Sequence, residues 1–146
     1  MNKLKSLTGK WKGEYTLGPE YETDEGKTFE FILDLVDENG TFVGICIERE
    51  ISEQLVEPIA ISGFWNKELI SFTKQYPFSY YVDENGEFVI DKAKEHPEII
   101  YTGVFNALLN GFSGDFEMVT ESIPGCDGWI EYVLTGQWFM KKFEIS

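Results

Sequence analysis

The stretch Ile61-Ser62-Gly63-Phe64-Trp65 (ISGFW) contains a four-residue motif that returns along the chain. The motif is Ser or Thr, then Gly, then any residue, then Trp or Phe, and it occurs five times. The other copies lie within LTGKW at residues 7–11, YTGVF at 101–105, FSGDF at 112–116 and LTGQW at 134–138. A Gly inside a strand has no side chain to pack, so each copy needs a structural reason. Strands of a closed barrel bend sharply. Gly permits that bend, and an aromatic residue two positions later, on the same face, covers the gap.

Alternation with a period of two indicates strands in most of the sequence. In residues 10–17 and 29–36, one face carries apolar residues or Gly, and the other face is richer in charged residues. This is the pattern of half-buried strands. The stretch DENG occurs at residues 37–40 and again at 83–86. Asn-Gly readily supplies the positive φ angles of a type I′ turn, so both stretches are predicted to close hairpins.

Further turns are predicted at residues 66–67 and 106–111, and a long last strand is predicted at residues 129–143. Only residues 52–56 and 92–96 are candidates for a short turn of helix. The sequence therefore predicts nine or ten strands in one domain, residues 1–146. Open sheet edges invite aggregation, so we expect closure. The predicted fold is an all-β, up-and-down antiparallel barrel of about eight to ten strands.

The charge balance excludes some partners. The chain has 26 acidic and 12 basic residues, a formal net charge of -14. Nucleic acid is not an expected partner because binding it requires Lys and Arg to replace the counterions of the phosphates. Anionic membranes are excluded for the same reason. No apolar run approaches a signal peptide or a membrane span of roughly 20 residues. We expect a cytoplasmic protein whose Cys46 and Cys126 are reduced thiols.

The repeated motif resembles the calycin superfamily, which includes lipocalins, fatty-acid-binding proteins and avidins. LTGKW resembles the Gly-x-Trp opening of those barrels, which implies that Trp11 closes one end under a basic side chain from the last strand, Lys141 or Lys142. Repeated Thr-Gly-x-aromatic motifs are similar to those of avidins in particular. In avidins an Asn two residues after the opening Trp binds the ureido oxygen of biotin, and Gly13 stands at that position here. The resemblance therefore implies a fold and does not establish biotin binding.

Catalytic and metal-binding patterns are missing from the sequence. The single histidine, His96, lies in KEHPE among charged neighbours, which indicates a solvated loop residue. There is no H-x-H, C-x-x-C or Gly-rich phosphate loop. We expect no metal, no cofactor and no catalytic residue, and a binding protein rather than an enzyme.

Two charged residues are candidate ligand contacts. Arg49 shares a face with Val43, Ile45 and Ile47 by alternation, which would carry it toward the interior. There it would anchor a carboxylate, as in fatty-acid-binding barrels; the alternative is a surface Arg paired with its neighbouring glutamates. Glu131 in the last strand either pairs with Arg49, binds a ligand, or lies at the exposed start of the strand.

Aromatic side chains are the strongest functional signal. An eight-stranded barrel has room for packed side chains or one small ligand. Rings with polar tips suit an amphipathic or ring-bearing molecule, although core packing explains them equally well. The predicted ligand-binding residues are Tyr15, Arg49, Trp65, Tyr80, Tyr101, Glu131 and Trp138.

Three functional hypotheses follow. The first is non-enzymatic binding of a small hydrophobic or aromatic ligand inside the barrel. The second is an acidic module, of the inhibitor or immunity type, that recognises a basic protein. The third is a metal-free enzyme that uses Tyr and Glu as acid and base, which requires a Glu beside a Tyr inside the cavity. Residues 42–51 and 59–65 are apolar on both faces, so we also expect a homodimer or higher oligomer through this wall.

Overall fold

The computed structural model describes residues 6–20, 25–48, 58–66, 68–77, 79–82, 84–85, 88–91, 98–126 and 128–143. Ten strands are present: β1 (Gly9–Leu17), β2 (Thr28–Glu38), β3 (Thr41–Ile47), β4 (Ile59–Asn66), β5 (Leu69–Gln75), β6 (Ser79–Val82), β7 (Phe88–Asp91), β8 (Ile99–Asn106), β9 (Gly111–Gly125) and β10 (Gly128–Lys142).

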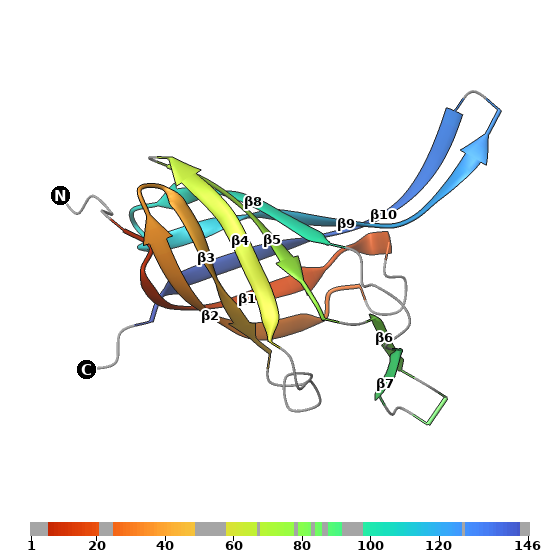
Figure 1. Cartoon of the computed structure of the whole chain (residues 1–146), viewed down its shortest axis with the longest axis horizontal. Coiled ribbons are helices and arrows are strands. Elements are labelled where there is room, and N and C mark those ends of the chain that lie inside the picture. The colour runs from red at the N-terminus through yellow and green to blue at the C-terminus, as the bar shows by residue number, and fades with distance from the viewer. Residues whose placement is uncertain are drawn as a thin grey trace.

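Eight of these strands close an antiparallel barrel in the order β1-β10-β9-β8-β5-β4-β3-β2, and β6 and β7 form a separate two-stranded sheet (Figure 1). The predicted all-β, up-and-down barrel is confirmed. The candidate helical segments 52–56 and 92–96 lie outside the described residues. In the described part of the chain, no helix has the length and apolar character needed to cross a bilayer.

The first DENG stretch closes the hairpin between β2 and β3. Asn39 and Gly40 have φ angles of 55° and 96°, the left-handed backbone that a type I′ turn requires at both central positions. The second DENG stretch lies between β6 and β7, which pair from Ser79 with Asp91 to Val82 with Phe88. The hairpins predicted from the two DENG stretches are therefore both present as strand pairs, β2 with β3 and β6 with β7.

The repeated motifs interlock between strands that are adjacent (β9 and β10) or separated by one strand (β8 and β10). Gly136 of β10 lies opposite Phe116 of β9, and a Cβ placed on Gly136 would lie 2.3 Å from the Phe116 ring. A Cβ on Gly103 of β8 would lie 2.8 Å from the ring of Trp138. The ring that fills the space beside each of these glycines therefore comes from a different strand. The expectation that the aromatic residue of the same strand covers its own Gly was wrong at these two positions.

Aromatic side chains fill the middle of the barrel. Phe72 and Tyr101 stack with their ring centres 4.8 Å apart and their planes within 6°. Trp138 packs edge-on against Phe72 at 5.3 Å. Phe116 of β9 packs edge-on against Tyr15 of β1, with ring centres 5.8 Å apart. These contacts bury large apolar areas and add the edge-to-face attraction of aromatic pairs, so this layer is the main hydrophobic core.

One end of the barrel is closed around Trp11, where β1 begins and β10 ends (Figure 1). Trp11 is fully buried, and its Nε1 donates a hydrogen bond to the carbonyl oxygen of Leu7 at 2.9 Å. The Nζ of Lys142 lies 5.4 Å from the centre of the Trp11 ring and donates to the carbonyl oxygen of Thr8 at 2.5 Å. Of the two candidate lysines, Lys142 thus lies over Trp11, whereas Lys141 is exposed.

The last two strands project beyond the barrel as a ribbon (Figure 1). β8 pairs with β9 only as far as Met118, and β1 pairs with β10 only from Gly136 onward. Beyond those points, residues 119–125 and 128–133 are paired with each other, with a register shift between Tyr132 and Val133. Such a shift bends a strand and increases its twist, which accounts for the departure of the ribbon from the barrel wall.

The Gly-to-ring contact predicts the effect of a single methyl group. We expect Gly136→Ala to lower the free energy of unfolding by about 1–3 kcal/mol because the new Cβ meets both the Phe116 ring and the carbonyl oxygen of Thr16. Lys12→Ala, on the exposed face of β1, is the control and should change it by less than about 0.5 kcal/mol. Urea unfolding measures both, and equal midpoints for the two variants would contradict the interlock.

Candidate functional site

A charged and hydroxyl-rich cluster lies inside the barrel at the end opposite Trp11. Tyr15, Glu48 and Tyr76 lie at or just beyond the ends of β1, β3 and β5. These strands alternate with antiparallel partners around the barrel, so they run in the same direction and end at the same side. Lys74 comes from the inward row of β5. Glu48 and Lys74 are 4% and 2% exposed, and they form an ion pair in the core.

The carboxylate of Glu48 is the centre of the cluster. Lys74 Nζ donates to Glu48 Oε2 at 2.6 Å, and the Tyr76 hydroxyl donates to Oε1 at 2.5 Å. The Tyr15 hydroxyl lies 3.4 Å from Oε1, and the thiol of Cys46 lies 3.7 Å from Oε2. A buried carboxylate needs a counter-charge and several donors, and Glu48 has both.

Three tyrosine rings surround the ammonium group of Lys74. Its Nζ lies 4.4 Å from the ring centre of Tyr15, 5.1 Å from that of Tyr101 and 5.3 Å from that of Tyr76. Burial alone would lower the pKa of Lys74, but the negative charge of Glu48, 2.6 Å away, favours the ammonium form, and the pKa lies well above its ordinary value. Lys74 is therefore a permanent cation at neutral pH and not a nucleophilic amine.

Burial also keeps two neighbouring groups neutral. It raises the pKa of the Tyr101 hydroxyl and that of the Cys46 thiol above their ordinary values, and the nearby Lys74 only partly offsets the effect. The cluster at neutral pH thus contains an ammonium group, neutral hydroxyls and a neutral thiol around the carboxyl group of Glu48. It can donate and accept hydrogen bonds, and its rings provide flat apolar walls.

Two of the predicted ligand-binding residues, Tyr15 and Tyr101, meet in this cluster, and Trp138 packs beside it. Trp138 is buried, and its ring centre lies 5.6 Å from that of Tyr101. Its Nε1 donates to the carbonyl oxygens of Thr102 and Asp115, at 3.1 Å and 3.0 Å. The indole is therefore held by the backbone of β8 and β9 and presents a face, not its polar atom, to the interior.

Trp65 lies at the opposite end of the barrel, away from the cluster. Its Nε1 donates to Asp37 Oδ2 at 2.8 Å, and the backbone N–H of Leu7 donates to the same oxygen at 2.9 Å. Burial opposes ionisation of Asp37, but these hydrogen bonds outweigh it, so the pKa of Asp37 is lowered. Trp65 thus joins the N-terminal segment to the hairpin at Asp37, which is a structural role.

The row of β3 that alternation assigns to Arg49 was expected to face the interior, and this expectation was wrong. Val43, Ile45 and Ile47 are 57%, 39% and 45% exposed, so the row that Arg49 continues faces outward along β3. The inward row instead leads through Cys46 to Glu48. Arg49 itself lies outside the described residues.

The backbones of Tyr80 and Glu131 lie in parts of the fold other than the barrel wall. Tyr80 belongs to β6 in the separate two-stranded sheet, and Glu131 pairs with Ser122 in the projecting ribbon. Their side chains lie outside what the structure describes.

The analysis of the sequence missed Glu48 and Lys74, and a signal for both was available. Lys74 follows Ile70 and Phe72 at a spacing of two, so alternation places it on the buried row of β5. Glu48 follows Phe42 and Cys46 in the same way. A charged residue that continues the alternation of a buried row is expected to lie inside with a partner. That alternation is a better guide to its position than the charged residues next to it in the sequence.

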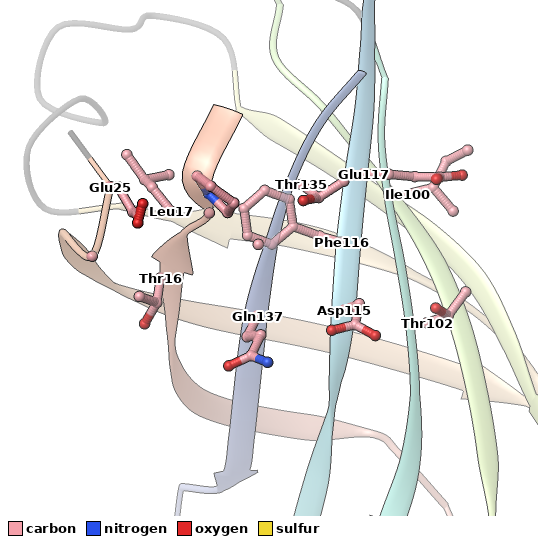
Figure 2. Close-up of a pocket in the computed structure, with 14 residues that line it drawn as sticks. Thr16, Leu17, Glu25, Ile100, Thr102, Asp115, Phe116, Glu117, Thr135 and Gln137 are labelled. Atoms are coloured by element: carbon pink, nitrogen blue, oxygen red, sulfur yellow. The ribbon is translucent and has the colours of Figure 1, made fainter. Parts of the chain in front are cut away.

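A pocket of about 700 Å³ lies on the outer wall, not in the interior. Its strand residues include Thr102, Asp115 and Gln137, which alternate with the inward-facing Tyr101 and Trp138 (Figure 2). The described residues contain no group of three or more His, Cys, Asp or Glu side chains arranged to hold a metal ion.

Comparison with known proteins identifies the fold. No protein-family model matches the sequence, and no curated protein matches it. Among solved structures, the chain is similar to that of a rhizavidin–biotin complex, with a TM-score of 0.51 and 15% identity over 99% of each chain. A second rhizavidin structure gives a TM-score of 0.45 and 13% identity over 92% of this chain and 85% of that one. At this identity the first likeness shows the fold alone: a closed antiparallel barrel like that of rhizavidin.

The ion pair predicts strongly non-additive effects on stability. Lys74→Met leaves the Glu48 carboxylate buried without its counter-charge and should destabilise the protein by about 3–5 kcal/mol. Adding Glu48→Gln to Lys74→Met removes the uncompensated charge, so the double variant should recover most of that loss. Urea unfolding of the wild type, both single variants and the double variant measures the coupling, and simple additivity would rule out an energetic pair.

Proposed function

We propose that this protein binds a small, uncharged, ring-bearing molecule at the end of the barrel where Tyr15, Glu48 and Tyr76 meet. The buried Lys74–Glu48 pair is the observation that supports the proposal. Hydrophobic residues of similar volume often stabilise a core as well as a buried ion pair does, or better. An ion pair surrounded by tyrosine rings is therefore better explained by recognition of a polar ligand than by stability.

The charge state of the cluster favours an uncharged ligand. Lys74 and Glu48 already neutralise each other at 2.6 Å, so an added carboxylate or ammonium group would be a buried charge without a partner. A neutral amide, urea, phenol or alcohol can accept a hydrogen bond from one member of the cluster and donate to another without changing the net charge. The tyrosine rings supply stacking surfaces for the ring of the ligand.

The rhizavidin–biotin complex supports a ligand within a barrel of this shape. The chain lacks the Asn that the resemblance to avidins implies, and Gly13 leaves no room for one. A Cβ on Gly13 would lie 2.1 Å from the carbonyl oxygen of Phe139 and 2.7 Å from the ring of Phe31. We therefore propose a ligand other than biotin.

Native mass spectrometry of protein purified gently from its own cells tests this proposal. We expect a reproducible added mass on the wild type and its loss in Tyr76→Phe, because that variant removes the hydroxyl bound to Glu48. Trp65→Phe, which changes the opposite end of the barrel, is the matched control and should keep the added mass. A wild-type protein that carries no added mass, or an added mass that Tyr76→Phe retains and Trp65→Phe loses, would refute the site.

A metal-free acid–base enzyme is the second candidate function. It requires a Glu beside a Tyr in the interior, and Glu48 accepts a hydrogen bond from Tyr76 there. The added mass discriminates between the two functions. A binding protein returns its ligand unchanged after incubation, whereas an enzyme converts it.

We also propose that a second copy of the chain covers the outer wall of β2 to β5. Six apolar side chains are exposed on these adjoining strands: Val36, Val43, Ile45, Ile47, Phe64 and Leu69. A row of this kind on one face is unusual for a monomer and typical of an interface between subunits.

Sedimentation at micromolar concentration measures the oligomeric state. We expect a dimer or higher oligomer, and we expect Phe64→Ser to shift it toward the monomer because Phe64 on β4 is 60% exposed. Leu108→Ser is the matched control: Leu108 is 97% exposed but lies in the turn between β8 and β9. A monomeric wild type, or equal shifts by both variants, would contradict the proposed interface.

A cytoplasmic location and reduced cysteines remain predictions from the sequence. Both thiols are free in the structure, Cys46 buried and Cys126 exposed near the turn of the ribbon.

A further inference from the structure

One half of the barrel wall carries no charge on its outer face. Outward residues alternate with core residues along β3, β4, β5 and β8, and each of these strands has four of them. In these four strands, which the structure describes in full, every outward residue is apolar or neutral polar. The other half of the wall is charged, and its exposed residues include Lys12 of β1, Asp34 of β2, Asp115 of β9 and Lys141 of β10. The outer faces of β3, β4, β5 and β8 thus form a charge-free wall.

A second copy of the chain fits the charge-free wall. Each copy carries a formal net charge of -14, so contact between two charged faces would bring like charges together. Contact between two charge-free walls avoids that repulsion. Four strands about 4.8 Å apart, each with four outward residues, cover about 500 Å². Two copies would therefore bury about 1,000 Å², which reaches the size of a specific interface. This wall contains five of the six exposed apolar residues of the interface proposed above.

The strand β3 connects the charge-free wall to the interior cluster. Ile45 and Ile47 are 39% and 45% exposed on the wall, whereas Cys46 and Glu48 are 3% and 4% exposed inside the barrel. Alternation thus places each member of one group next to a member of the other. A surface that packs on Ile47 therefore restrains the backbone from which the Glu48 side chain projects.

The sheet holds the two members of the ion pair differently. Lys74 lies within β5 and is paired on both sides, with β4 and with β8. By contrast, β3 is paired with β2 only as far as Ile47 and with β4 only as far as Cys46. Glu48 lies just beyond both of these last pairs. The position of Lys74 is thus set by the sheet, whereas that of Glu48 depends on how firmly the end of β3 is held.

We infer that association of two copies through the charge-free wall fixes the end of β3 and, with it, the Glu48 side of the interior cluster. This inference rests on the proposed function and on the interface proposed with it. Coupling between two sites is reciprocal, so a ligand in the cluster strengthens association by the same factor by which association strengthens ligand binding. The affinity of the interior site thereby depends on protein concentration.

Labelling of the Cys46 thiol by a maleimide tests the inference without a ligand. Cys46 is buried, with its thiol 3.7 Å from Glu48 Oε2, so labelling requires the end of β3 to open. Cys126→Ser first removes the exposed thiol. We expect the rate constant to fall at least about fivefold from concentrations at which sedimentation shows monomer to those at which it shows dimer. Phe64→Ser, which weakens association, should keep the monomer rate at both concentrations.

The dissociation constant of the dimer measures the coupling in the reverse direction. Glu48→Gln with Lys74→Met neutralises the cluster and changes nothing on the outer face. We expect this double variant to raise the dissociation constant at least about fivefold. Met140→Leu is the matched control because it conserves volume in the core of β10, on the side of the barrel opposite β4. It should leave the dissociation constant unchanged.

The outcomes separate this inference from the proposals beneath it. A wild type that stays monomeric would overturn the interface and the coupling together. A dimer in which labelling of Cys46 does not depend on concentration, or in which Met140→Leu weakens association as much as the double variant does, would overturn the coupling alone. A dimer that protects Cys46 but carries no added mass in native spectra would support the coupling and refute the proposed ligand.

Discussion

The narrow interior of an eight-stranded barrel is the constraint on which the rest of this structure depends. Such a barrel is just wide enough for its own side chains, so a large ring on one strand requires a missing side chain on a neighbouring one. Phe116 lies opposite Gly136, and the Trp138 ring lies beside Gly103. The repeated motif supplies a Gly and a ring at a fixed spacing, and copies on adjacent strands, or on strands one apart, then fit into each other. The Gly-x-aromatic motif is therefore repeated along the sequence because the closed barrel needs a Gly beside each large ring.

The fold could be predicted because its signals are local. Period-two alternation, the Asn39-Gly40 turn and the Gly-x-aromatic motifs each act within a few residues and agree with one another. The ribbon formed by the ends of β9 and β10 could not be predicted because its departure depends on where β8 and β1 stop pairing. That is a property of partners far away in sequence, and alternation within one strand carries no information about it.

The candidate site was only partly predictable for a related reason. Tyr15 and Tyr101 could be placed inside by alternation, but the row of Val43, Ile45 and Ile47, which was expected to face inward, faces outward, and the inward row leads to Glu48. In a strand, one residue is the difference between the core and the solvent. β3 is apolar on both faces, with Ile45 and Ile47 exposed and Cys46 buried, so hydrophobicity could not tell which row faces inward. The register of β3 against β2 settles this, and register is set by the closed barrel.

The position of the ion pair connects the packing to the chemistry. At the Trp11 end the core is closed by Leu7, Met140 and other fully buried apolar side chains, whereas at the far end the inward rows finish in Lys74 and Glu48. The same strands thus pass from a hydrocarbon core to a polar cluster within a few residues. A group bound at the far end meets rings on its sides and a neutral pair of opposite charges beneath it. Under the proposed function, an uncharged polar group fits this far end better than a charged one because a third buried charge would have no partner.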